Sequence, residues 1–149
     1  MECVILKINK MREILFRGKR IDNRRWVEGH LVVCKTNGRS FITELIEVDE
    51  DSWLYWEVDP NTVGQYTGQK AAYKDINSDC LCRGQEVFEG DILSDQKGNV
   101  LSYVRFTEER GWMVGVESLY DYTDRYDDKE ALIIGNIFDN PELMKGGEK

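Results

Sequence analysis

Short apolar segments separated by turn-forming residues constrain this chain more than any other feature, because they return about every 8–12 residues. In SFITELIEV (40–48), Ile42, Ile46 and Val48 share one face of an extended strand, since side chains alternate along it. The same short pattern recurs in segments 12–17, 25–34, 52–58, 91–106, 112–119 and 131–138. It predicts an all-β fold of mainly antiparallel short strands, resembling a small barrel or sandwich.

Turn signals predict how these strands connect. Asn37-Gly38 is the strongest, because both residues tolerate the positive φ of a tight hairpin. A second hairpin is predicted at residues 97–99, and a β-bulge at Gly135-Asn136. Near the C-terminus, residues 139–144 predict a short helical turn with Asn140 as its N-cap.

One irregular stretch, QKAAYKDINSDCLCR (69–83), divides the chain, because it lacks a strand-like pattern and is typical of a surface loop. Hairpin signals on both sides of it suggest two subdomains. The predicted organisation is an N-terminal extension (1–10), an N-terminal β subdomain (11–68), the inserted loop (69–83), a C-terminal β subdomain (84–144) and a disordered tail (145–149).

Charge limits the classes of partner. The net charge is −8, yet residues 1–40 hold 10 Lys/Arg against 4 Asp/Glu, and the remaining residues hold 10 against 24. Broad affinity for nucleic acid is disfavoured, because phosphate contacts require clustered positive charge. No apolar run approaches the roughly 20 residues of a membrane span, and the charged start MECVILKINKMREILF lacks the pattern of a signal peptide. We expect a cytoplasmic protein without a membrane partner.

Residues that usually carry metal or nucleophilic chemistry are few. Cys80 and Cys82 offer two close thiolates, but a structural zinc site needs a second such pair, and His30 is the only histidine. All four cysteines are expected as reduced thiols. No G-x-S-x-G, P-loop or G-x-G-x-x-G motif is present. The sequence therefore predicts no catalytic, cofactor or metal site, and a protein that is not an enzyme.

Paired carboxylates keep one enzymatic alternative open. In GQEVFEGDIL (84–93), Glu89 and Asp91 flank a glycine, which fits either a catalytic pair or a turn that leads into a strand. The turn is favoured, because glycine supplies unusual φ and aspartate accepts backbone N–H bonds. The pairs Asp121/Asp124 and Asp127/Asp128 belong to an acidic run without calcium-loop spacing, which is expected to be a solvated loop.

A basic segment beside an aromatic residue, RGKRIDNRRW (17–26), is the one candidate binding surface. Such residues can hold phosphate and stack a base, or the arginines can pair with acidic residues of the same chain. The candidate residues are Arg17, Lys19, Arg20, Arg24, Arg25 and Trp26. In SWLYWEV (52–58), the aromatic side chains are expected as core anchors, with an exposed stacking surface as the alternative.

Four segments in order resemble the YopX family of phage and prophage proteins: MREILFRGKRIDNRRWVEG (11–29), VGQYTG (63–68), GQEVFEGDIL (84–93) and IIGNIFDNPEL (133–143). The resemblance implies an all-β fold and a mobile-element origin, and it carries no assigned activity or catalytic residue. Several matching positions are turn-type residues, so a role in maintaining the fold is expected. These positions are Gln65, Tyr66, Gly68, Glu89, Gly90, Asp91, Gly135 and Asn136.

These observations together predict a phage or prophage accessory protein that is a non-enzymatic protein-binding module. Its expected partner is a host or phage protein, and homo-oligomerisation is open. The alternative is a nucleic-acid or nucleotide binder that uses residues 17–26, and an enzyme that uses carboxylates ranks third.

Overall fold

The computed structural model describes residues 14–45, 53–74, 81–123 and 129–145. The expected extension (1–10), Cys3, Cys80, the acidic residues 124–128 and tail residues 146–149 lie outside these ranges. Lys145, predicted as the first residue of the tail, is the last residue of a helix. No helix in the described part of the chain is both long and apolar enough to cross a membrane.

The first half of the chain forms a short meander. The hairpin predicted at Asn37-Gly38 is confirmed: Cys34 N–H donates to Arg39 O at 2.8 Å, and Gly38 has φ 73°. Asp59 ends the last strand of the meander, because its side chain accepts a hydrogen bond from the N–H of Asn61 and caps a 3-10 turn. The elements are β1 (Phe16–Lys19), β2 (Trp26–Val33), β3 (Ser40–Leu45), β4 (Trp53–Val58) and η1 (Pro60–Thr62).

The second half begins with a long strand and ends with a short helix. The elements are β5 (Gly64–Lys74), β6 (Leu81–Phe88), β7 (Asp91–Ser94), β8 (Val100–Thr107), β9 (Gly111–Val114), β10 (Glu117–Ser118), η2 (Leu119–Asp121), β11 (Leu132–Asn136) and α2 (Glu142–Lys145).

The predicted all-β class with a short C-terminal helix is confirmed. Within the described residues the strand order is β10-β9-β8-β7-β11-β5-β1-β2-β3-β4, and β6 pairs with β5 outside this path. The expectation of a barrel-like or sandwich-like arrangement is refined, because this order is open, with β10 and β4 at its ends. The sheet is mixed, since β11 pairs with β5 in parallel and the other pairs are antiparallel.

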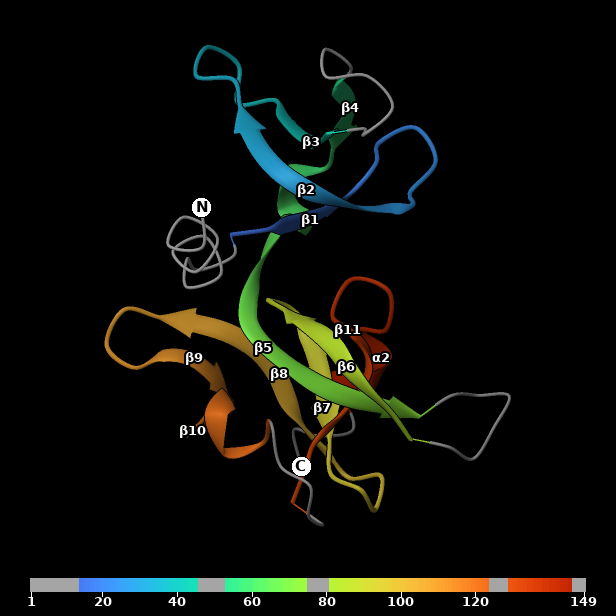
Figure 1. Cartoon of the computed structure of the whole chain (residues 1–149), viewed down its shortest axis with the longest axis vertical. Coiled ribbons are helices and arrows are strands. Elements are labelled where there is room, and N and C mark those ends of the chain that lie inside the picture. Colours follow the sequence, from blue (N-terminus) through green and yellow to red (C-terminus); the bar gives the residue numbers. More distant parts are fainter. Residues whose placement is uncertain (1–13, 46–52, 75–80, 124–128, 146–149) are drawn as a thin grey trace, which may run out of the picture.

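Strand β5 connects the two halves of the molecule, and Figure 1 shows it curving from the β1–β4 meander into the β6–β11 half. The hydrophobic core lies in the second half, where strands from both sides of β5 bury aliphatic side chains. Its most buried members include Val87, Leu93, Val104, Leu119 and Ala131, each at 0% exposure. The first half contributes a smaller buried set that includes Ile42 and Val58.

Local predictions for the second half are partly confirmed. Gly98 has φ 92° in the turn between β7 and β8, as the hairpin signal requires. A bulge lies next to the predicted position Gly135-Asn136, at Ile134, because the register between β11 and β7 shifts between Ile133 and Gly135. Asn140 differs from its prediction as an N-cap: its side-chain oxygen accepts from the Asn136 N–H, which folds the chain back onto β11.

The stretch 69–83 was wrongly predicted as irregular throughout. Residues 69–74 continue β5 and residues 81–83 begin β6, so the described parts of this stretch form a hairpin arm. Register shifts after Tyr66 and Ala71 explain why no regular alternation of apolar residues was visible in the sequence.

Candidate functional site

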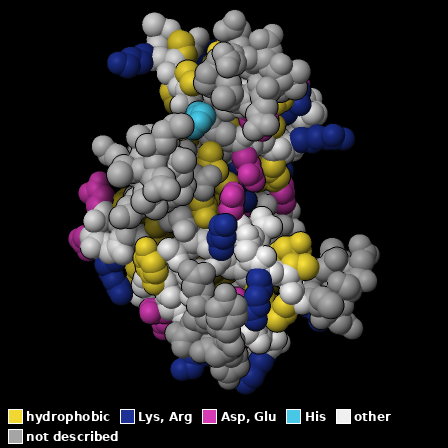
Figure 2. Space-filling model, viewed as in Figure 1, with side chains coloured by type: hydrophobic (Ala, Val, Ile, Leu, Met, Phe, Trp, Pro, Cys, Tyr) yellow, Lys and Arg dark blue, Asp and Glu magenta, His cyan; other side chains and the backbone are white. Residues whose placement is uncertain are grey.

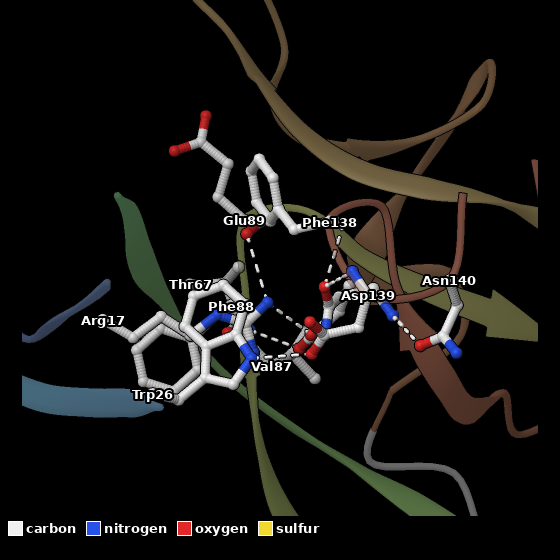
Figure 3. Close-up of polar contacts among 11 residues, drawn as sticks. Arg17, Trp26, Thr67, Val87, Phe88, Glu89, Phe138, Asp139 and Asn140 are labelled. Carbon is white, nitrogen blue, oxygen red and sulfur yellow. Dashed lines mark hydrogen bonds and ion pairs between the residues drawn. The ribbon is translucent and has the colours of Figure 1, made fainter. Parts of the chain in front are cut away.

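Arg17 lies at the junction of the two halves, inside a cluster that we call the Arg17 clamp (Arg17, Trp26, Phe88 and Asp91). Its guanidinium carbon is 4.7 Å from the Trp26 ring centroid and 5.0 Å from that of Phe88. Its Nη2 donates to Asp91 Oδ1 at 2.6 Å, and only 12% and 4% of the two side chains is exposed. Figure 3 shows the guanidinium beside Trp26 and Phe88. The clamp therefore joins β1 and β2 to the turn between β6 and β7.

Asp91 has a structural role within the clamp. Its second oxygen, Oδ2, accepts from the Phe88 N–H at 2.8 Å and so closes the turn that precedes β7. Burial raises the pKa of the Asp91 carboxyl, whereas the Arg17 cation and the Phe88 N–H act in the opposite direction. Both carboxylate oxygens are thus occupied by groups of the same chain.

The predicted turn at Glu89-Gly90-Asp91 is confirmed, because Gly90 has φ 93° between β6 and β7. Glu89 does not form a carboxylate pair with Asp91: its main-chain oxygen accepts from Arg17 Nη2 at 3.5 Å, and its carboxylate points away from the clamp (Figure 3). Glu89 is therefore part of the turn, and Asp91 is the ion-pair partner of Arg17.

A second internal ion pair lies beside the clamp. Lys19 pairs with Asp139, and the Trp26 Nε1–H donates to Asp139 Oδ2 at 2.7 Å. Burial alone would raise the pKa of Asp139, but hydrogen bonds from Lys19, Trp26 and Asn136 outweigh it and lower the pKa to about 2. Three of the six residues predicted as a binding surface, Arg17, Lys19 and Trp26, therefore have partners within the protein.

The other three candidate residues, all arginines, lie at the surface. Arg20 forms a bidentate pair with Asp22, with distances of 2.9 and 2.5 Å. Arg24 has φ 59° and contacts Asp59 at 3.3 Å, and Arg25 is exposed. On the face seen in Figure 2, basic side chains are scattered among acidic and apolar ones rather than gathered in one patch.

Positions that match the family signature gather at the turns around β5, β7 and β11. Gly64, next to Gln65, and Gly135 both lack room for a side chain: a Cβ would lie 2.7 Å from Glu89 O and 2.4 Å from Asn140 Oδ1, respectively. Tyr66 is buried with its ring centroid 5.6 Å from that of Phe88. Asn136 Oδ1 accepts from the N–H groups of Phe138 and Asp139. These contacts are internal to the protein, and the role of the signature positions in maintaining the fold stays a prediction.

Gly68 is the signature position that borders open space. It has φ 83°, and a Cβ placed there would have no neighbour within 4 Å. It lies in the irregular part of β5, where the register with β6 shifts between Tyr66 and Lys70. This irregularity forms one wall of a surface cavity of about 440 Å³, which we call the aromatic groove. The groove is lined by Thr67, Gly68, Gln69, Phe106, Arg110, Gly111, Trp112 and Tyr120.

Aromatic side chains form the opposite wall of the groove. Phe106 and Trp112 are paired across the β8–β9 hairpin, and their rings meet edge to face at 5.1 Å. Trp112 is almost buried and anchors the wall to the core, whereas 52% of Phe106 and 66% of Tyr120 is exposed. Arg110 is fixed at the turn by a hydrogen bond from its Nη1 to Val116 O at 3.0 Å. The groove thus presents exposed rings and a cation on a rigid support.

The sequence analysis missed the aromatic groove. Phe106 and Trp112 are paired directly across the hairpin whose turn lies at residues 108–110, so the hairpin itself was a local signal that these rings are neighbours. Tyr120 and Gly68 had no such signal, because their proximity depends on the η2 turn and on the β5 irregularity. Among the described residues, no three His, Cys, Asp or Glu side chains come together in a way that could hold a metal ion.

The open β-sheet and the aromatic groove define a small all-β protein with a preformed surface site. Comparison with protein families identifies it further. The chain belongs to the YopX family, because the family model described as YopX protein matches residues 15–145. No curated protein and no solved structure matches the chain.

Proposed function

We propose that this YopX family member is a non-enzymatic protein-binding module that binds its partner through the aromatic groove. The observation that supports this function is the exposure of Phe106 and Tyr120 on one cavity wall. Protein interfaces are enriched in aromatic residues and arginine, and these residues contribute most of the binding energy. Trp112 and Arg110 complete that composition in the groove.

The family resemblance also supports a biological setting for this proposed function. The resemblance of the chain to a family of phage and prophage proteins supports an accessory role in a bacterial host, with a host or phage protein as the partner. The same setting supports a location in the cytoplasm of that host. A second copy of the chain is the alternative partner for the groove.

Nucleic-acid or nucleotide binding by residues 17–26 is the second candidate function, and it has less support. Arg17 and Lys19 form internal ion pairs, and the surface residues Arg20 and Arg24 already pair with aspartates that a phosphate would have to displace. Charge reversal at Arg20 and Arg24 tests this candidate in binding assays with DNA, RNA and nucleotides. Unchanged affinities in the double variant would dismiss it, because phosphate contacts should respond to charge.

The groove proposal is tested by affinity capture from lysates of the bacterial host, followed by binding measurements with the purified partner. The double variant Phe106→Ala/Tyr120→Ala should lose the partner, because truncation of two interface aromatic residues typically costs several kcal/mol. The matched control is Ile14→Ala, which shortens an exposed apolar side chain that does not line the groove. Absence of any reproducible partner, together with a monomer in light scattering, would count against the proposal.

A further inference from the structure

Strand β4 ends the sheet, and among the described residues its outer edge is paired only from Glu57 to Asp59, where Arg20 bridges Val58. The β3–β4 register and the bond from Ile21 N–H to Glu57 O at 3.1 Å show that Glu57 directs its main-chain groups away from β3. Since main-chain groups alternate along a strand, Tyr55 also directs its N–H and C=O toward the outer edge. Within the described residues, Tyr55 makes no backbone hydrogen bond on that side.

Among the described residues, the part of this edge that precedes Glu57 has few of the features that protect edge strands against added strands. Natural edge strands carry lysine, proline or bulges, whereas Trp53–Val58 reads WLYWEV and pairs with β3 without a register shift. The expectation that the aromatic side chains of this strand are core anchors is wrong for Tyr55, of which 62% is exposed. The edge is therefore both accessible and apolar.

A cleft of about 410 Å³ adjoins the free edge and indicates which side chains would fit beside it. It is lined by Arg20, Ile21, Asp22, Tyr55, Trp56 and Glu57. Its charges are already paired: Arg20 binds Asp22, and Glu57 binds Arg39 at 2.7 and 2.8 Å. The remaining surfaces are the exposed Ile21 and Tyr55 side chains and the Trp56 ring, 5.6 Å from the Arg20 guanidinium. Apolar side chains suit this cleft better than charged ones.

We propose that β4 accepts an extended, apolar peptide segment of a partner protein as an added strand. The Tyr55 N–H and C=O would bind the peptide backbone, as in other complexes formed by strand addition. The added strand would end before Glu57, because residues 19–21 already pair with the outer edge of β4 from Glu57 to Asp59. Successive side chains of the added strand would meet the Tyr55 face and the Trp56 face alternately. This site shares no residue with the aromatic groove, so it stands whether or not the groove binds a partner.

A second copy of the chain is a poorer occupant of this edge. In two β4 strands paired antiparallel about Tyr55, Glu57 of each copy would lie opposite Trp53 of the other, where the segment that contains Ile21 already occupies the outer edge. The free edge is also short, and a dimer held by so few residues would bury much less than the roughly 1,200 Å² of a stable interface. A flexible peptide does not have to satisfy this symmetry.

The variant Tyr55→Pro tests the proposal sharply. Proline removes an N–H that faces solvent, so it should leave the β3–β4 ladder intact while preventing backbone pairing with a peptide. Peptides are first selected for binding to the wild-type chain from a displayed library of random short sequences. We expect the selected apolar peptides to bind Tyr55→Pro at least about tenfold more weakly, because a backbone hydrogen bond is lost. Phe106→Ala/Tyr120→Ala should bind them normally.

A second test distinguishes strand addition from nonspecific hydrophobic contact, and a control verifies the fold of the variant. N-methylation of the peptide should abolish binding at alternate positions and be tolerated between them, because only every second N–H faces β4. Circular dichroism and thermal unfolding verify that Tyr55→Pro is folded. The proposal is overturned if no selected peptide is weakened by Tyr55→Pro in folded protein, or if β4 instead forms a concentration-dependent dimer that this variant disrupts.

Discussion

The Arg17 clamp and the aromatic groove contain the same kinds of side chain but expose them to very different extents. In the clamp, Arg17 lies between two rings and binds Asp91, so almost none of its surface is free. In the groove, Arg110 is anchored by a main-chain carbonyl, while Phe106 and Tyr120 stay largely exposed. An arginine beside aromatic residues is therefore a poor indicator of a binding site until its partners and its burial are known.

Removal of Asp91 should have the largest effect on stability. Asp91→Ala leaves the Arg17 cation buried without its acceptor and opens the Phe88 turn, and breaking a buried ion pair costs about 3–5 kcal/mol. Urea unfolding monitored by circular dichroism measures this loss. The control Glu89→Ala should change stability by less than about 0.5 kcal/mol, because that carboxylate points away. Equal effects of the two variants would mean that the clamp does not hold the halves together.

Two glycines with similar φ give the next comparison. Gly90, beside the clamp, has φ 93°, and Gly68, in the groove, has φ 83°. Alanine at either position costs about 1–2 kcal/mol for its backbone conformation. At Gly90 the new Cβ would also lie 3.1 Å from Phe138 Cε2, whereas at Gly68 it meets nothing within 4 Å. Gly90→Ala should therefore destabilise the protein more than Gly68→Ala in thermal unfolding, and the reverse order would contradict the close packing at the clamp.

Acid should weaken the ion pair beside the clamp. The pKa of Asp139 is about 2 in the folded protein against an ordinary value of 3.8, so its stabilising contribution is complete above the ordinary value. That contribution falls as the pH drops from about 4 to about 2, because protonation ends the bond to Lys19. Solvent screening limits it to about 1 kcal/mol. Unfolding free energies measured across this range should show a shallower pH dependence for Asp139→Asn than for the wild type.

Much of the fold could be predicted from the sequence, because local signals determine it. Asn37-Gly38 and residues 97–99 each act through a positive φ, which needs no distant partner. The β5–β6 arm was missed, since its register shifts disrupt the alternation that reveals a strand. Such irregularity is visible only when both strands are in place.

The candidate site was predicted less well, because it depends on contacts between distant segments. Arg17 meets Asp91 across 74 positions, and Trp26 meets Asp139 across 113. Nothing near residues 17–26 indicates that these side chains have partners inside the protein. The hairpin that pairs Phe106 with Trp112 was a usable local signal, but the exposure of Phe106 depends on how distant elements pack, which the local sequence does not show.

Truncation of Phe106 should have the smallest effect on stability and the most informative one for function. Because 52% of the side chain is exposed, Phe106→Ala should lower the unfolding free energy by only about 0.5 kcal/mol. The buried Phe88 of the clamp is the control, since Phe88→Ala should cost about 3–5 kcal/mol. If Phe106→Ala proved as costly as Phe88→Ala, the ring would belong to the core and the groove would lose its binding surface. A small loss of stability combined with loss of the captured partner would instead assign Phe106 to recognition, because the ring then contributes little until a partner covers it.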